Sequence, residues 1–155
     1  MEVNENYVIN VDTKALKPVQ HFQYQTKILD AKGEYYSTKT CKELLMESCI
    51  EHLTTFDGAL TAVRKRFGFT KEPPLVIDKV NELIVIPTKS PTSHHCSWYF
   101  LSHIDVTQTL SSSKETSQAQ AIYFHDQTHL PTSLSRHSLK EKLSKALTVQ
   151  HDIRK

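Results

Sequence analysis

Glycine is scarce in this chain, which has three glycines among its 155 residues. A dinucleotide-binding loop needs the closely spaced pattern G-x-G-x-x-G, and a Walker-type phosphate loop needs glycine followed by lysine. Neither pattern occurs. The sequence therefore argues against a nucleotide-binding enzyme.

Long hydrophobic runs are also missing. The longest ones, residues 83–87 and 98–101, are far shorter than the roughly 20 apolar residues that cross a bilayer. The three cysteines are an odd number, and Met1–Glu5 lacks the basic start of a signal peptide. We therefore expect reduced thiols, a cytoplasmic location and no membrane partner.

The chain has no strong net charge either, since its formal net charge is +2. The charge is unevenly distributed, however. Residues 62–71 contain Arg64, Lys65, Arg66 and Lys71 and no acid, and residues 136–155 carry six bases against two acids. Such segments are either the footprint of a nucleic acid or solvated helix faces, and the charge pattern leaves both interpretations open.

Alternation of apolar and polar residues predicts an antiparallel arrangement of strands and hairpins. The expected strands are residues 7–11, 21–29 and 34–37, a hairpin of 75–77 with 83–86, a strand over 98–106, and a short hairpin of 119–125 with 128–131. Two prolines make residues 87–93 a loop, and the polar segment 111–118 is expected to be mobile.

Helix start and stop signals predict two central helices. Thr40 and Glu43 have the spacing of a capping box, so residues 41–52 should form a helix with Cys41 and Cys49 facing the core. Asp57 is the expected N-cap of the next helix, and Gly68 its end.

A second capping box, Ser138 with Glu141, predicts a C-terminal amphipathic helix. Its apolar face should carry Leu139, Leu143 and Leu147, with Lys140, Lys142 and Lys145 outside. The expected fold class is α+β, one domain over residues 1–155, with antiparallel sheet and about three helices. The ends, about 1–5 and 150–155, are expected to fray.

The side chains that could carry chemistry do not form a convincing catalytic or metal site. His94-His95-Cys96 with His103 suggests zinc, but adjacent residues rarely supply enough ligand directions and no C-x-x-C partner exists. The alternative is a packed Cys96 beside two exposed histidines. A nucleophile pair of Cys96 and His103, or a carboxylate pair of Asp78 and Glu82, is no more specific. We predict no catalytic residue, metal or cofactor.

Trp98, Tyr99 and Phe100 are adjacent aromatic residues. They could form a base-stacking platform for single-stranded nucleic acid, or they could be core residues of a strand. The sequence leaves both readings open.

Residues 48–105 resemble the ComK family of competence transcription factors. The likeness rests on an ordered series of motifs rather than on composition. These are Ser48-Cys49, Gly58 with Arg64, Pro73-Pro74-Leu75-Val76-Ile77-Asp78, Asn81 with Ile84, Pro87-Thr88, Ser90-Pro91, Cys96-x-Trp98 and His103-Ile104. A weaker likeness extends over roughly residues 7–150.

The resemblance implies a transcription activator of genes for DNA uptake. Proteins of this family bind AT-rich promoter boxes through the minor groove, act as dimers that pair on DNA, and are controlled by adaptor-directed proteolysis. The implied partners are thus AT-rich double-stranded DNA, a second copy of the chain, adaptor and protease regulators and RNA polymerase, at the nucleoid in the cytoplasm.

The predicted DNA contacts come from the basic segment and the loop after residue 87. Arg64 and Arg66 would probe the groove, because arginine inserts into narrow AT-rich minor grooves. Phosphate contacts are expected from Lys65, Lys71 and Lys89, with Thr88, His94 and His95 on the adjoining loop. The alternative is a short family member that acts as an interaction module, heterodimerising with a longer partner without strong DNA binding of its own.

Overall fold

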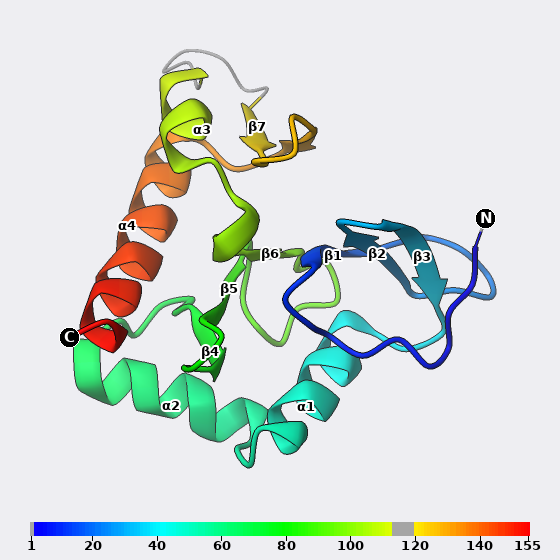
Figure 1. Ribbon diagram of the computed structural model, residues 1–155, viewed down its shortest axis with the longest axis horizontal. Coiled ribbons are helices and arrows are strands. Elements are labelled where there is room, and N and C mark those ends of the chain that lie inside the picture. Colours follow the sequence, from blue (N-terminus) through cyan, green and yellow to red (C-terminus); the bar gives the residue numbers. More distant parts are fainter. Residues whose placement is uncertain (1, 113–119) are drawn as a thin grey trace.

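A six-stranded antiparallel sheet forms the centre of the computed structural model, which describes residues 2–112 and 120–155 (Figure 1). The strand order is β3-β2-β1-β6-β5-β4. The strands are β1 (Thr13–Pro18), β2 (Thr26–Asp30), β3 (Gly33–Ser37), β4 (Leu75–Asp78), β5 (Leu83–Pro87) and β6 (Trp98–Phe100). The hairpins β2–β3 and β4–β5 confirm the pairings predicted from the sequence.

Four α-helices and a small second sheet surround the large one. The helices are α1 (Cys41–Glu51), α2 (Phe56–Phe67), α3 (Val106–Ser112) and α4 (Arg136–Ile153). The second sheet pairs β7 (Gln120–Tyr123) with β8 (His129–Thr132), close to the predicted hairpin. The α+β class and the C-terminal helix are confirmed, and α3 is the helix that the sequence patterns did not predict.

The large sheet separates two hydrophobic cores. On one face, α1 and α2 bury residues such as Leu45 and Leu60 against Leu16 and Trp98 of the sheet. On the other face, α4 and the β7–β8 sheet pack against the alternate residues, which include Ala15 and Tyr99. Successive strand residues point to opposite faces, so one short sheet supplies both cores.

The expected strand at residues 7–11 is wrong. That segment is irregular, with Tyr7 and Ile9 buried in the core and the Tyr7 hydroxyl donating to Asp30 at 2.6 Å. The first strand is β1, which contains Lys14 and Lys17 and therefore lacks an obvious apolar alternation. Lys14 is buried there because its Nζ pairs with Asp126 at 2.6 Å and donates to Thr128 at 2.9 Å.

Two other predicted strands are too long. Of residues 21–29, only Thr26 onward is in β2, because the rings of the preceding residues stack on one another instead of pairing with a neighbouring strand. The predicted strand 98–106 ends at Phe100 and is followed by a 3-10 turn, η1 (Leu101–His103), and then by α3. Residues 111 and 112 belong to α3, and 113–118 lie outside the described residues.

The helix ends partly confirm the capping predictions. Thr40 and Glu43 form the predicted capping box, and Gly68 ends α2 with φ +75°. The N-cap of α2 is Thr55 rather than Asp57, since the Thr55 hydroxyl accepts from the Gly58 amide at 2.9 Å. The N-cap of α4 is Ser135 rather than Ser138.

The buried face of α4 differs from the prediction at two positions. Leu147 is 38% exposed, and Lys142 is only 9% exposed although it was expected outside. The Lys142 Nζ pairs with Glu72 at 2.5 Å, which allows its stem to cover apolar surface. The helix continues to Ile153, through the segment that was expected to fray, and Arg154 beyond it pairs with Glu82 at 2.6 Å.

Within the described residues, no helix combines the length and the apolar character that a bilayer crossing would need.

Candidate nucleic-acid interface

The loop between β5 and β6 is held in one shape by its own polar groups. At its base, the Thr88 amide donates to the Ser97 carbonyl and the Thr88 hydroxyl accepts from the Ser97 amide, both at 2.9 Å. Cys96 is buried, and its thiol donates to the Lys89 carbonyl at 3.5 Å. Lys89, His94 and His95 are consequently exposed on a preformed loop, whereas Thr88 is a buried positioning residue.

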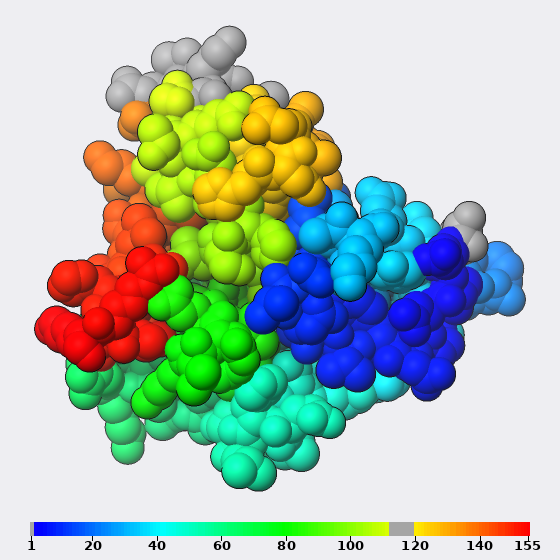
Figure 2. All heavy atoms as spheres, viewed as in Figure 1, coloured from blue at the N-terminus to red at the C-terminus, as the bar shows by residue number. Residues whose placement is uncertain are grey.

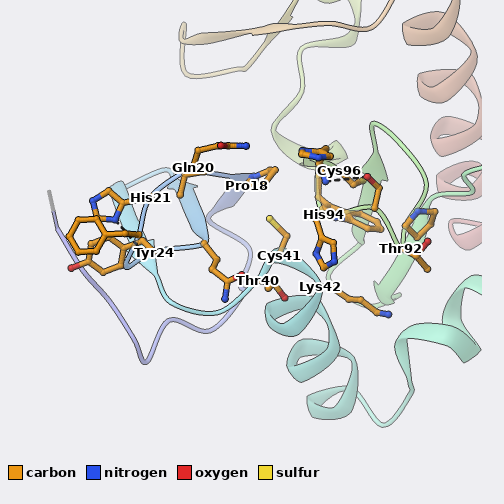
Figure 3. A pocket seen from close by; sticks show the side chains of 17 residues that line it. Pro18, Gln20, His21, Tyr24, Thr40, Cys41, Lys42, Thr92, His94 and Cys96 are labelled. Carbon is orange, nitrogen blue, oxygen red and sulfur yellow. Dashed lines mark hydrogen bonds between the residues drawn. The ribbon is translucent and has the colours of Figure 1, made fainter.

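This loop forms one wall of a groove of about 660 Å³, which we call the loop groove. The opposite wall is the β1–β2 connection, with His21 and Tyr24, and the start of α1 lies between the two walls (Figure 3). The lining residues are Pro18, Val19, Gln20, His21, Phe22, Tyr24, Gln25, Thr40, Cys41, Lys42, Pro91, Thr92, Ser93, His94, His95, Cys96 and Trp98.

No carboxylate lines the loop groove among the described residues, although the chain has 17 acidic residues. Its basic side chains are Lys42 and the three histidines 21, 94 and 95. The N-terminus of α1 adds little positive charge, because its capping box uses the Thr40 hydroxyl and the Glu43 carboxylate as acceptors there. A groove of this electrostatic character suits an anionic ligand.

The two cysteines of the groove are not poised for chemistry. Burial raises the pKa of the Cys41 thiol to about 12, and burial also raises the pKa of Cys96. Both thiols therefore stay protonated at neutral pH, whereas a nucleophile or metal ligand needs the thiolate. His103 is occupied elsewhere, because its Nε2 lies 2.7 Å from the Val11 carbonyl.

Within the part of the chain that the structure describes, no three His, Cys, Asp or Glu residues come together as a metal site. The aromatic platform expected from residues 98–100 is also closed to bases, because Trp98, Tyr99 and Phe100 are 1–3% exposed. They are core residues, which decides between the two readings of that motif.

The basic segment of α2 is partly neutralised. The Arg66 guanidinium donates to both carboxylate oxygens of Asp152, at 2.8 and 3.2 Å. This hydrogen bond with Arg66 lowers the pKa of Asp152 below its ordinary value, so the pair stays charged at neutral pH. Arg66 therefore contributes much less free positive charge than its position in the sequence suggests.

The rest of that segment forms a second basic surface, which we call the α2–α4 surface. Arg64 Nε donates to the Thr70 carbonyl at 3.3 Å, and Lys145 donates to the Lys71 carbonyl at 3.1 Å. Lys65 and Lys71 are exposed, and among the described residues their ammonium groups form no ion pair.

The predicted site residues thus fall into two groups. Arg64, Lys65 and Lys71 belong to the α2–α4 surface. Lys89, His94 and His95 are exposed on the loop between β5 and β6, and the two histidines line the loop groove. No hydrogen bond or ion pair between described residues joins the two groups. Sequence reasoning missed Lys42, His21 and Phe22 as site residues. Residues 13–29 and 83–104 contain no acidic residue, and this signal could have indicated the two walls of the loop groove.

The model of the ComK protein family matches residues 4–155, nearly the whole chain. The chain belongs to the ComK family. This confirms the resemblance carried by the Pro73–Asp78 and Cys96-x-Trp98 motifs. In the structure the first motif leads into and forms β4, and the second leads into β6, with Cys96 and Trp98 lining the loop groove.

One curated ComK-family relative is the competence transcription factor of Bacillus subtilis (strain 168), which is 24% identical over 105 residues. The match covers 67% of this chain and 54% of that protein, so the chain aligns with about half the length of its relative. No solved structure matches this ComK-family chain.

Proposed function

We propose that this chain is a DNA-binding transcription regulator that activates competence genes, and that the loop groove is its main DNA contact. The observation that carries the proposal is that no carboxylate of the described residues lines a groove that holds Lys42, His94 and His95. Phosphate attraction supplies most of the affinity of DNA-binding proteins, and a carboxylate in the groove would oppose it. The family membership and the name of the curated relative support the regulatory role.

In this proposal AT-rich duplex DNA is the ligand, and the minor groove is the side that the protein contacts. Lys89 and Lys42 hold phosphates beside the loop groove, and Lys65 and Lys71 of the α2–α4 surface hold a neighbouring stretch of backbone. Arg64 is the arginine that remains available for a narrow minor groove, because Asp152 holds Arg66. The protein acts as a dimer, and adaptor, protease and RNA polymerase contacts lie outside this groove.

The test is a titration of the purified chain onto an AT-rich duplex and a GC-rich duplex of equal length, at two salt concentrations. We expect tighter binding to the AT-rich duplex and weaker binding at the higher salt. Replacing His94 and His95 together with alanine should weaken binding more than Arg66→Ala, whose side chain is already paired. Absence of binding to any duplex at low salt would overturn the proposal.

A second candidate function is an interaction module that does not bind DNA strongly. It is favoured by a separate groove of about 730 Å³ between α2, the β4–β5 hairpin and the end of α4. Two apolar side chains project beside it, Leu53 at 96% and Val80 at 90% exposure. Two results together would favour this function: the wild-type chain binds no DNA, and the Leu53→Ser and Val80→Ser double variant loses the self-association of the wild type.

A further inference from the structure

The connection between β1 and β2 carries the most exposed aromatic side chain among the described residues, Phe22, which is 91% exposed. The connection projects at the right-hand edge of the molecule, beyond β3, where Figure 2 shows it as a blue protrusion. A phenyl ring with 91% of its surface exposed contributes little to a core, and it is available for a contact outside this chain.

Ring stacking and hydrogen bonds within the tip support its conformation. The His21 ring stacks on Phe22 at 4.8 Å between centroids and on Tyr24 at 5.0 Å, with interplanar angles of 19° and 25°. His21 Nδ1 accepts from the amides of Gln23 at 3.0 Å and Tyr24 at 3.3 Å, which fixes the imidazole ring. Phe22 is therefore presented in one orientation before any ligand arrives, which lowers the entropy cost of contact.

Positive charge lies at the foot of this tip. Lys17 of β1 and Lys27 of β2 are directly opposite each other in the sheet. Like charges at paired positions are destabilising. Glu34 pairs with Lys27 at 3.3 Å, but no carboxylate of the described residues forms an ion pair with Lys17. This arrangement suits an anion that approaches the base of the tip.

The cations occupy both sides of the tip. Leu16 packs in the core beneath α1, so its neighbour Lys17 points to the opposite face of the sheet. Lys42 and His94 lie on the α1 side, in the loop groove. A flat apolar ring with cations on either side has the chemistry of a wedge that enters duplex DNA, with a phosphate backbone to each side.

We propose that Phe22 is a wedge residue that inserts at a base-pair step of the bound duplex and stacks on a base, while Lys17 and Lys42 contact the two flanking backbones. This inference rests on the proposed function and assigns its contact residues. A base step is favoured over a second protein chain because the described lining of the loop groove and residues 13–29 contain no carboxylate, and Glu34 near the base of the tip is already paired with Lys27.

The test compares Phe22→Ala with the wild-type chain and with Ile50→Ala, a control that removes an exposed apolar side chain of α1 outside both grooves. The ligand is an AT-rich duplex with 2-aminopurine in place of one adenine, and affinity and fluorescence are both measured. Wild-type and Ile50→Ala protein should raise the fluorescence, because unstacking relieves the quenching of 2-aminopurine. Phe22→Ala should not raise it, and should bind about 5- to 150-fold more weakly.

Two further readouts separate stacking from charge and from folding. The loss in Phe22→Ala should be the same factor at every salt concentration, because the ring releases no counterions. Phe22→Trp should restore binding and the fluorescence change. The melting temperature should match the wild type, since the side chain is solvated.

The failures are distinguishable. A wild-type chain that binds no duplex overturns the proposed function and this inference together. A wild-type chain that binds DNA, with Phe22→Ala binding equally well, overturns the inference alone. Loss of self-association in Phe22→Ala, with unchanged 2-aminopurine fluorescence on DNA, would place the ring in a protein interface and also overturn it.

Discussion

Removing Lys42 from the loop groove, or Lys17 from the base of the β1–β2 tip, should change the salt dependence of DNA binding by a definite amount. Each phosphate contact contributes about 0.9 to the slope of log K against log salt concentration. Lys17 and Lys42 are positions where one cation can be deleted without breaking an ion pair of the described residues. Lys17→Met and Lys42→Met should each lower the slope by about 0.9, and the double variant by about 1.8.

The same slope sets the loss of affinity. At about 0.1 M monovalent salt, the loss per lysine is RT × 0.9 × ln 10, or about 1.2 kcal/mol, which is roughly an 8-fold weaker complex. The loss should shrink to almost nothing near 1 M salt. Methionine keeps the apolar stem of each lysine, but Lys42→Met also removes the ammonium that lies 5.5 Å from the centre of the Phe56 ring.

The assay is fluorescence anisotropy with a labelled AT-rich duplex over a series of KCl concentrations. Lys79→Met is the control, because Lys79 is exposed on the β4–β5 turn and the charge change is identical. If Lys79→Met lowers the slope as much as Lys17→Met and Lys42→Met do, the effect is one of net charge. Unchanged slopes in all three would refute the placement of DNA at the loop groove.

Three further predictions concern stability. Lys142→Met should lower the free energy of unfolding in urea by about 2 kcal/mol, because Glu72 then keeps a largely buried charge without its partner. Adding Glu72→Gln to that variant should recover part of the loss. Equal stability of the wild type, the single variant and the double variant would contradict this. Gly68→Ala should cost about 1 kcal/mol in thermal unfolding, because φ +75° disfavours a side chain even in open space. Burial opposes ionisation of Asp126, but hydrogen bonds from Lys14 and Thr128 prevail and lower its pKa to about 2. Its folded pKa is below the unfolded value of about 3.9, so its stabilisation is present above about pH 4 and lost as pH falls towards 2. The Asp126 side chain is 42% exposed, which limits this stabilisation to under about 1 kcal/mol. The free energy of unfolding in urea should therefore fall less between pH 6 and pH 3 in Asp126→Asn than in the wild type.

Local signals predicted the elements whose stabilising contacts are close in sequence. The capping box at Thr40, the stop at Gly68 and the β2–β3 hairpin each depend on neighbours within a few residues. Lys14 and Lys142 show the limit of such reasoning, because both are buried by carboxylates that lie 112 and 70 residues away. Without those partners the sequence could only be interpreted as placing both lysines in solvent.

The candidate site was predicted in part for a similar reason. His94 and His95 were recognisable because two prolines mark their loop. Phe22 and Tyr24 alternate with polar residues and so imitate a strand, whereas their conformation depends on stacking with His21. The pairing of Arg66 with Asp152 joins residues 86 apart, so the compensation of that arginine's charge was not visible in the basic run.

The pairing of β1 with β6 has a consequence for how the chain is synthesised. Leu16 is opposite Trp98 and Ala15 is opposite Tyr99, so the amino-terminal β-meander gains its central neighbour only after about 98 residues have left the ribosome. Until then β1 is an open edge, and unpaired strand edges invite aggregation and proteolysis. A nascent chain halted before Trp98 should therefore need chaperone protection, whereas one that has passed Phe100 can close the sheet.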